Sequence, residues 1–323
     1  MLIRWQQQVR ASAVVSQVGP ADQSVKQSVK QPVRQPVRPQ QLALRLGCNE
    51  AGKTVLRDRF MAYPLSISPV FRLDADGSGT DAVSEQRAYL YRMNTSPGLL
   101  AGDVLGMSLA LEAGSALYLA DQAATKVHTM PGDGTKAAVH YEVAVGDRAT
   151  LEFLPEPLIL FADAELKQVT DITLYPTAGL TWGEIILPGR LARGECYEFR
   201  EYWSTIRIKS PSGAVAFVET MKLLGKGNQF LQRSLFASGP VMGTLILGLP
   251  DAIATPETLK ALSEDVDRLS ADSIEIASSV LPQGNGLFVR AIAQKTQAMQ
   301  GAFKAIATLT RKLRNQAPLP YSV

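Results

Sequence analysis

One segment of this sequence has the residue types and spacing of a phosphate-binding loop. Residues 47–54 read GCNEAGKT and match the G-x-x-x-x-G-K-[ST] pattern, in which backbone N–H groups and a lysine hold nucleotide phosphates. An apolar run that ends at Asp163 is similar to the strand that supplies a magnesium-binding aspartate in such proteins. A P-loop nucleotide-binding enzyme that uses Gly47–Thr54 is therefore one hypothesis for this chain.

The surroundings of this segment favour a different interpretation. A P-loop follows a strand buried on both faces, whereas residues 42–46 read LALRL and alternate as in a strand with one buried face. A P-loop also opens a long helix, but Pro64 follows Thr54 after only nine residues that carry no apolar stripe. We therefore expect a hairpin turn that exposes Lys53, and we keep nucleotide binding as the alternative.

The two histidines are the other residues that could bind a metal ion. His128 and His140 could supply imidazole nitrogens to a borderline metal such as nickel. The groups that could join them are carboxylates and a thiol, namely those of Asp121, Asp133, Glu142 and Cys196. No pair has the tight spacing of a dedicated site, such as H-x-x-x-H. Each histidine is thus expected on a strand or at the surface, and a transient, low-affinity metal contact stays open.

The positive charge of the chain is concentrated near its N-terminus. The net charge is +3, but residues 1–40 carry +5, so the remainder sums to −2. A basic face on the folded part is therefore not indicated, which argues against dedicated nucleic-acid binding. Within residues 23–40 a four-residue unit recurs as SVKQ-SVKQ-PVRQ-PVRP, with little apolar surface to bury. We expect residues 1–40 to be a disordered, low-complexity tail.

The composition indicates a cytoplasmic protein. No run of about 18 apolar residues predicts a membrane span. The N-terminal residues MLIRWQQQVR lack the apolar core of a signal peptide. Cys48 and Cys196 are too few to indicate a disulfide scaffold in 323 residues, so a reducing compartment fits best.

The middle of the chain predicts a succession of short β-strands. Residues 139–145 read VHYEVAV, with the period of a strand that buries one face. Glycines that punctuate turns recur at Gly114, Gly146 and Gly179, at spacings of 32 and 33 residues that stacked β-layers would produce. We therefore predict a mainly β, irregular layered or solenoid-like scaffold over residues 41–250.

The last part of the chain changes character. Thr255 and the proline after it have the pattern of a helix start, followed by leucines at helical spacing. Residues 274–281 and 287–292 predict two strands, and residues 294–314 predict a second helix with a basic end that suits the helix dipole. We expect residues 251–323 to be a small α+β portion of about two helices, packed on the same body.

Four strings in the β-region match a family pattern in order. Residues 94–103 read NTSPGLLAGD, similar to N-x-x-G-G-x-x-x-G-D, with Ser96-Pro97-Gly98 where two glycines are frequent. Residues 121–126 read DQAATK, similar to T-Q-A-A-T-K. Residues 154–159, LPEPLI, and 189–195, GRLARGE, match L-P-x-P/E-x-I and G-R-x-x-x-G-E. Together they resemble the urease accessory UreD (UreH) family, whose T-x-L…P-L pattern also fits Thr54–Leu65.

The resemblance implies a non-enzymatic urease maturation chaperone. Members of the family assist nickel insertion into apo-urease in complex with a helical accessory protein, UreF, and a nickel-carrying GTPase, UreG. In such a complex the GTPase activity belongs to UreG, so the resemblance implies no tightly bound cofactor here and only transient contact with nickel. It also implies a β-rich, irregular layered fold with a few helices.

A protein that relays a metal ion needs weakly ligating polar groups along a path rather than a closed cage. The candidates for path lining or partner contact lie on or next to the matching strings: Asp103, Gln122, Lys126, His128, Glu156 and Glu195. Asp103 and Glu195 have a second interpretation, because each follows a glycine where its carboxylate could accept from backbone N–H groups of a turn. A β-solenoid interaction protein with an unrelated partner is a further hypothesis.

Overall fold

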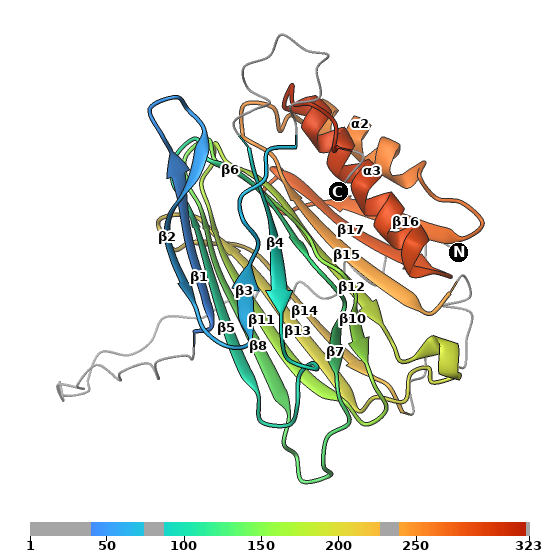
Figure 1. The fold of residues 1–323 in the computed structure, drawn as a ribbon. Coiled ribbons are helices and arrows are strands. Elements are labelled where there is room, and N and C mark those ends of the chain that lie inside the picture. Colours follow the sequence, from blue (N-terminus) through green and yellow to red (C-terminus); the bar gives the residue numbers. More distant parts are fainter. Residues whose placement is uncertain (1–39, 74–86, 227–238, 321–323) are drawn as a thin grey trace, which may run out of the picture. The chain divides into compact units, whose positions relative to one another are not determined.

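The computed structural model describes residues 40–73, 87–226 and 239–320, whose strands form two sheets that face each other across a shared core (Figure 1). The predicted tail lies outside these ranges apart from Gln40. No helix within the described ranges is long and apolar enough to cross a membrane.

The first sheet runs in the order β14-β13-β11-β8-β5-β1-β2. Its strands are β1 Leu42–Cys48, β2 Thr54–Met61, β5 Val104–Leu111, β8 Ala137–Val145, β11 Glu165–Leu174, β13 Glu201–Lys209 and β14 Val215–Leu224. The pairs β1–β5, β5–β8, β8–β11 and β11–β13 are parallel. The two edge strands are antiparallel to their neighbours: β14 pairs with β13, and β2 pairs with β1.

The second sheet runs in the order β16-β17-β15-β12-β9-β6-β4-β3. Its strands are β3 Leu65–Ile67, β4 Ala88–Asn94, β6 Ala116–Asp121, β9 Thr150–Leu154, β12 Gly179–Leu187, β15 Val241–Gly248, β16 Ile274–Val280 and β17 Gly286–Ala293. The short strands β7 Thr125–Val127 and β10 Leu158–Leu160 pair with each other, and β10 pairs with β12. The neighbours β4, β6, β9 and β12 are parallel, and a 3-10 turn, η2, spans Leu191–Arg193.

From β4 to β13 the long strands alternate between the two sheets, so this part of the chain winds in stacked layers. The glycines predicted to recur lie in equivalent turns: Gly114 between β5 and β6, Gly146 between β8 and β9, and Gly179 at the start of β12. Gly114 has a φ of +73°, which favours glycine. At Gly146 a Cβ atom would lie 2.7 Å from the carbonyl oxygen of Leu111. The predicted mainly β, layered architecture is confirmed.

The core between the sheets follows from the alternation in the strands. In β8, Val139, Tyr141 and Val143 are buried between the sheets, whereas His140 and Glu142 lie on the opposite face. By contrast, every residue of β9 is buried, because its outer face is also covered. The second sheet therefore lies in the middle of the body, with apolar contacts on both of its faces.

Two helices cover the outer face of the second sheet. They are α2, Pro256–Asp267, and α3, Thr296–Leu313 (Figure 1). The predicted cap is present, because the Thr255 hydroxyl accepts from the N–H of Thr258 at 3.2 Å. Met299 and Phe303 of α3 are buried against β15, next to Gly243, where a side chain would collide with both. Both predicted helices and both predicted strands of this part are confirmed.

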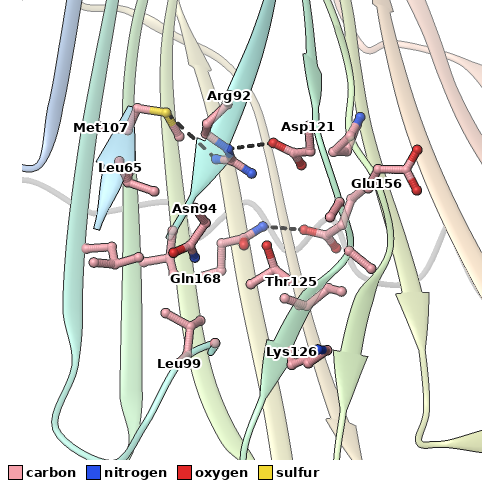
Figure 2. A pocket seen from close by; sticks show the side chains of 18 of the residues that line it. Leu65, Arg92, Asn94, Leu99, Met107, Asp121, Thr125, Lys126, Glu156 and Gln168 are labelled. Carbon is pink, nitrogen blue, oxygen red and sulfur yellow. Dashed lines mark hydrogen bonds and ion pairs between the residues drawn. The ribbon is translucent and has the colours of Figure 1, made fainter. Parts of the chain in front are cut away.

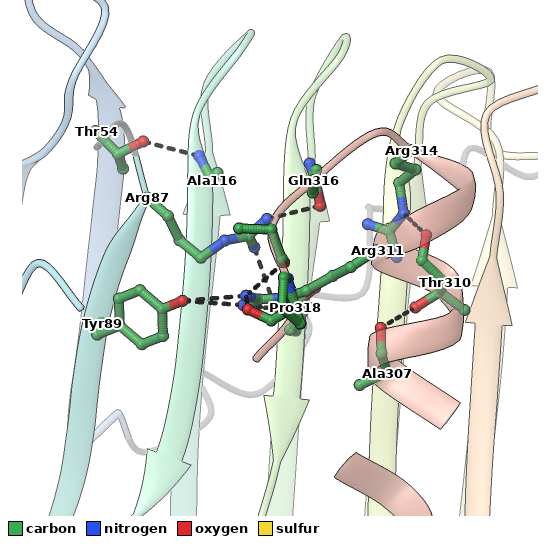
Figure 3. A network of polar contacts seen from close by, with 12 residues as sticks. Thr54, Arg87, Tyr89, Ala116, Ala307, Thr310, Arg311, Arg314, Gln316 and Pro318 are labelled. Carbon is green, nitrogen blue, oxygen red and sulfur yellow. Dashed lines mark hydrogen bonds and ion pairs between the residues drawn. The ribbon is translucent and has the colours of Figure 1, made fainter. Parts of the chain in front are cut away.

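A buried ion-pair network fastens α3 to the second sheet (Figure 3). The Arg311 side chain is 1% exposed and pairs at 2.6 Å with Glu152 of β9, which is fully buried. Arg87 approaches the same carboxylate at 3.2 Å, and the hydroxyl of Tyr89 accepts from Arg311 at 3.2 Å. Burial alone would raise the pKa of Glu152, but the nearby arginines outweigh it and lower that pKa to about 2. Glu152 is therefore ionised wherever the protein is folded at ordinary pH.

The segment that matches the P-loop pattern is a hairpin turn. β1 and β2 pair antiparallel on either side of it, and the N–H of Asn49 donates to the carbonyl of Lys53 at 2.9 Å. Lys53 is exposed, whereas Thr54 is buried and its hydroxyl accepts from the N–H of Ala116 at 2.8 Å. Thr54 begins a strand rather than a helix, so no helix N-terminus is present here to hold phosphate. The fold contradicts the nucleotide-binding hypothesis.

Replacing Lys53 by alanine should therefore have little effect. We expect the free energy of unfolding to change by less than about 0.5 kcal/mol, as for other exposed substitutions. We also expect calorimetric titration of the unmodified protein with ATP or GTP to show no saturable heat. Saturable binding that disappears in Lys53→Ala would restore the nucleotide hypothesis.

Candidate functional site

A cavity of about 230 Å³ lies where β4, β6 and β9 end. Because these strands are parallel, their carboxyl ends meet at one edge of the second sheet. Three of the four family-like strings follow those ends and line the cavity, through residues 96–99, 122–126 and 155–156. The fold thus brings together segments that are separated by about 60 residues of sequence.

The cavity wall contains a buried ion pair (Figure 2). Nε of Arg92 donates to the Asp121 carboxylate at 2.5 Å, and Nη1 of Arg92 donates to the Tyr141 hydroxyl at 2.9 Å. Burial raises the pKa of Asp121, and the charge of Arg92 opposes this shift only in part. Burial would lower the pKa of Arg92, but Asp121 outweighs it and the pKa is raised. Arg92 therefore stays charged inside the body.

A second carboxylate in the wall is held by neutral groups. Glu184 of β12 accepts from the amide of Gln168 at 2.5 Å and from the hydroxyl of Ser204 at 3.3 Å. Burial raises the pKa of Glu184 to about 7. Glu184 can therefore gain or lose a proton near neutral pH, in contrast to Glu152 on the other face of the sheet.

These contacts belong to a row of polar side chains that bridges the two sheets. At its far side Arg290 of β17 pairs with Glu219 of β14. Glu184, Thr244 and Arg290 are register neighbours across β12, β15 and β17, so they share the inner face. We call this row the inter-sheet belt, and it consists of Arg92, Asp121, Tyr141, Gln168, Glu184, Ser204, Glu219 and Arg290.

Three predicted site residues line the cavity. Gln122 and Lys126 are exposed at its rim. Glu156 is partly buried, accepts from the amide of Gln300 at 3.0 Å, and has a pKa that burial raises. These three residues therefore surround the opening of a cavity whose inner wall is the inter-sheet belt.

The other three predicted residues do not line it. The carboxylate of Asp103 accepts from the N–H of Leu100 at 2.8 Å, as the turn interpretation expects. Glu195 accepts from the N–H of Ala162 at 3.0 Å and pairs with Arg190. Burial would raise the pKa of Glu195, but these contacts lower it. His128 lies nearby, with Nε2 3.1 Å from the carbonyl oxygen of Pro97, which is at the cavity rim.

The set of nitrogen, oxygen and sulfur ligands proposed around the histidines is not assembled. His140 lies on the outer face of the first sheet, while His128 lies beside the cavity rim. Over the described ranges no group of three or more His, Cys, Asp or Glu side chains is placed to hold a metal ion. Cys48 and Cys196 are both free thiols.

Sequence reasoning missed most residues of the cavity wall, although it named Asp121 as a possible metal ligand. Arg92, Gln168 and Glu184 belong to strands, and only the strings that follow the strands had attracted attention. A signal was present, because GLTWGEIIL places one carboxylate inside a largely apolar run that is buried up to its last residue. A charged residue in such a run is rare unless it is paired or functional.

Comparison with known proteins assigns the chain to a family. Residues 39–322 match the family model described as UreD urease accessory protein. The chain is 45% identical over 280 residues to "Urease accessory protein UreD" of Trichodesmium erythraeum, covering 87% of this chain and 97% of that protein. It is 28% identical over 271 residues to "Urease accessory protein UreD 2" of Streptomyces griseus, covering 83% of this chain and 88% of that one.

The match covers all described residues from the first strand to the end of α3. The matched residues include those of the cavity, the inter-sheet belt and the ion-pair network of α3. The chain therefore belongs to the UreD family of urease accessory proteins.

Proposed function

We propose that this chain is a non-enzymatic chaperone that assists nickel insertion into apo-urease. It would act in the cytoplasm, in complex with the helical protein UreF and the GTPase UreG. Family membership supports a role in urease maturation, and the chemistry of the cavity supports nickel as the cargo. In this role nickel is a passing substrate of the protein and not a resident cofactor.

The observation that carries this proposal is the inter-sheet belt, a row of polar side chains within the otherwise apolar core between the two sheets. Five of the eight belt residues are buried and three are partly buried, and apolar residues could replace such paired groups with little or no loss of stability, so stability alone does not account for the row. Carboxylate, hydroxyl and amide oxygens bind a divalent cation weakly when they are not gathered into a cage. Within the row, the oxygen atoms of Gln168, Glu184 and Ser204 could hold a cation briefly and release it, which a delivery protein requires.

The hypothesis of an interaction protein with an unrelated partner rests on the layered fold alone. Stacked strands offer broad surfaces whatever the partner is. The family assignment favours urease and its accessory proteins as partners. Co-purification of a tagged chain with UreF, UreG and urease subunits tests this choice.

Deletion and complementation test the proposed function in cells. In a urease-producing host supplied with nickel, deletion of the gene for this protein should abolish most urease activity, and the intact gene should restore it. The nickel content of the purified urease should fall and recover in parallel. Full activity and full nickel content in the deletion strain would refute the proposal.

A variant of the belt tests the cavity itself. Gln168→Leu keeps the size of the side chain but removes a polar group of the belt, so we expect at least a roughly tenfold loss of restored urease activity. Lys167→Leu is the matched control, because it alters the next residue of the same strand on the other face of the sheet. The proposal for the belt fails if both variants restore urease equally while Gln168→Leu remains folded.

A further inference from the structure

Three potential metal-binding atoms converge on one guanidinium in the cavity wall. The Asp121 carboxylate lies 2.5 Å from Nε of Arg92, and the Tyr141 hydroxyl lies 2.9 Å from Nη1. The thioether sulfur of Met107 lies 3.7 Å from the same Nη1 (Figure 2). A carboxylate, a phenol oxygen and a thioether together form a set that a borderline divalent cation accepts.

Aromatic rings add to this preference for a cation. The guanidinium carbon of Arg92 lies 5.7 Å from the ring centre of Tyr141 and 5.4 Å from that of Phe153. The side chains of Arg92 and Asp121 are 10% and 5% exposed, so water screens their charges little. The groups around Arg92 thus form a site that favours a cation, and the guanidinium of Arg92 occupies this site.

We propose that Arg92 is a placeholder cation that keeps the site formed by Asp121, Tyr141 and Met107 from trapping a divalent ion. This inference rests on the proposed function, because only a protein that must release its cargo gains from a weakened site. In the intact protein the guanidinium occupies the ligands and repels a second cation. Without the arginine charge, the Asp121 carboxylate would be buried without a counter-charge, and a divalent ion could supply the missing charge.

The test compares nickel retention by purified full-length variants. Arg92→Gln removes the charge but keeps a side chain that can donate a hydrogen bond to Asp121. After equilibrium dialysis against nickel chloride, we expect Arg92→Gln to bind nickel roughly tenfold or more tightly than the unmodified protein, which corresponds to about 1.4 kcal/mol. Added nickel should raise the melting temperature of Arg92→Gln and leave that of the unmodified protein unchanged.

Three further variants separate the placeholder role from general effects of charge. Arg92→Lys keeps the charge and should retain little nickel. Lys260→Gln removes the same charge from the exposed side of α2, away from the cavity, and should also behave like the unmodified protein. The double variant Arg92→Gln/Asp121→Asn lacks the carboxylate and should lose the gain in retention.

Two results would overturn the inference. One is a folded Arg92→Gln protein that retains no more nickel than the unmodified chain. The other is aggregation of Arg92→Gln and Arg92→Met whether or not nickel is present, because a replacing cation should restore the paired charge. Either result leaves the proposed function standing, since complementation by the unmodified gene tests that function separately.

Discussion

Replacing Arg311 by leucine is expected to lower the free energy of unfolding by about 3–5 kcal/mol, the range found when one partner of a buried ion pair is removed. The substitution leaves the Glu152 carboxylate inside the body with Arg87 as its remaining partner at 3.2 Å. It also removes the hydrogen bonds from Arg311 to Tyr89 and to the carbonyl of Pro318 (Figure 3). Chemical denaturation followed by the fluorescence of the buried Trp182 measures the change.

The control for this prediction is an arginine on the surface. Arg268 pairs with Glu264 and Asp265 of α2, but its side chain is 68% exposed. Arg268→Ala should therefore change the free energy of unfolding by less than about 1 kcal/mol. If Arg311→Leu were as mild as Arg268→Ala, the network would not be what holds α3 on the sheet.

Replacing Glu184 by glutamine is expected to stabilise the protein at alkaline pH and to have little effect in acid. Burial raises the pKa of this carboxyl from an ordinary value of 4.5 to about 7. The folded state therefore binds the proton more tightly than the unfolded state does. The stability from the protonated form is fully present below about pH 4.5 and is lost as the pH rises to about 7.

The expected size follows from about 1.4 kcal/mol for each unit of pKa difference, which gives a loss of roughly 3 kcal/mol above pH 7. Glutamine is neutral throughout and can still accept from Gln168, so the variant avoids this loss. Denaturation at a series of pH values from 5 to 8.5 should show the two proteins diverging as the pH rises. Glu142→Gln, on the exposed face of β8, is the control. Parallel curves for Glu184→Gln and the unmodified protein would contradict the prediction.

Local patterns in the sequence were sufficient to predict the layered fold. The recurring glycines marked one end of successive layers, since only glycine fits where Gly146 meets the backbone of Leu111. The cap residue and the apolar spacing of the C-terminal helices were also local features, and they sufficed to predict both helices. The hairpin at residues 47–54 followed from the alternation of β1, despite its match to a nucleotide motif.

The cavity was only partly predictable, because its wall depends on the register between distant strands. The sequence strings that follow the strand ends match a family pattern, and this match singled out Gln122, Lys126 and Glu156. Arg92 and Glu184 lie inside strands, and nothing local shows that they face the same interior. Gln168 reaches Glu184 across the two sheets only because β11 and β12 belong to opposite sheets.

The ion pair between Glu152 and Arg311 also sets an order of events during synthesis. The two residues are 159 positions apart, and Tyr89 precedes Arg311 by 222. At typical ribosomal rates of about 5–20 residues per second, Glu152 waits roughly 8–30 s for its main partner to leave the ribosome. Until then the Glu152 carboxylate and the apolar side chains around it lack the cover that α3 provides. The network that holds α3 on the sheet can therefore form only when translation is nearly complete.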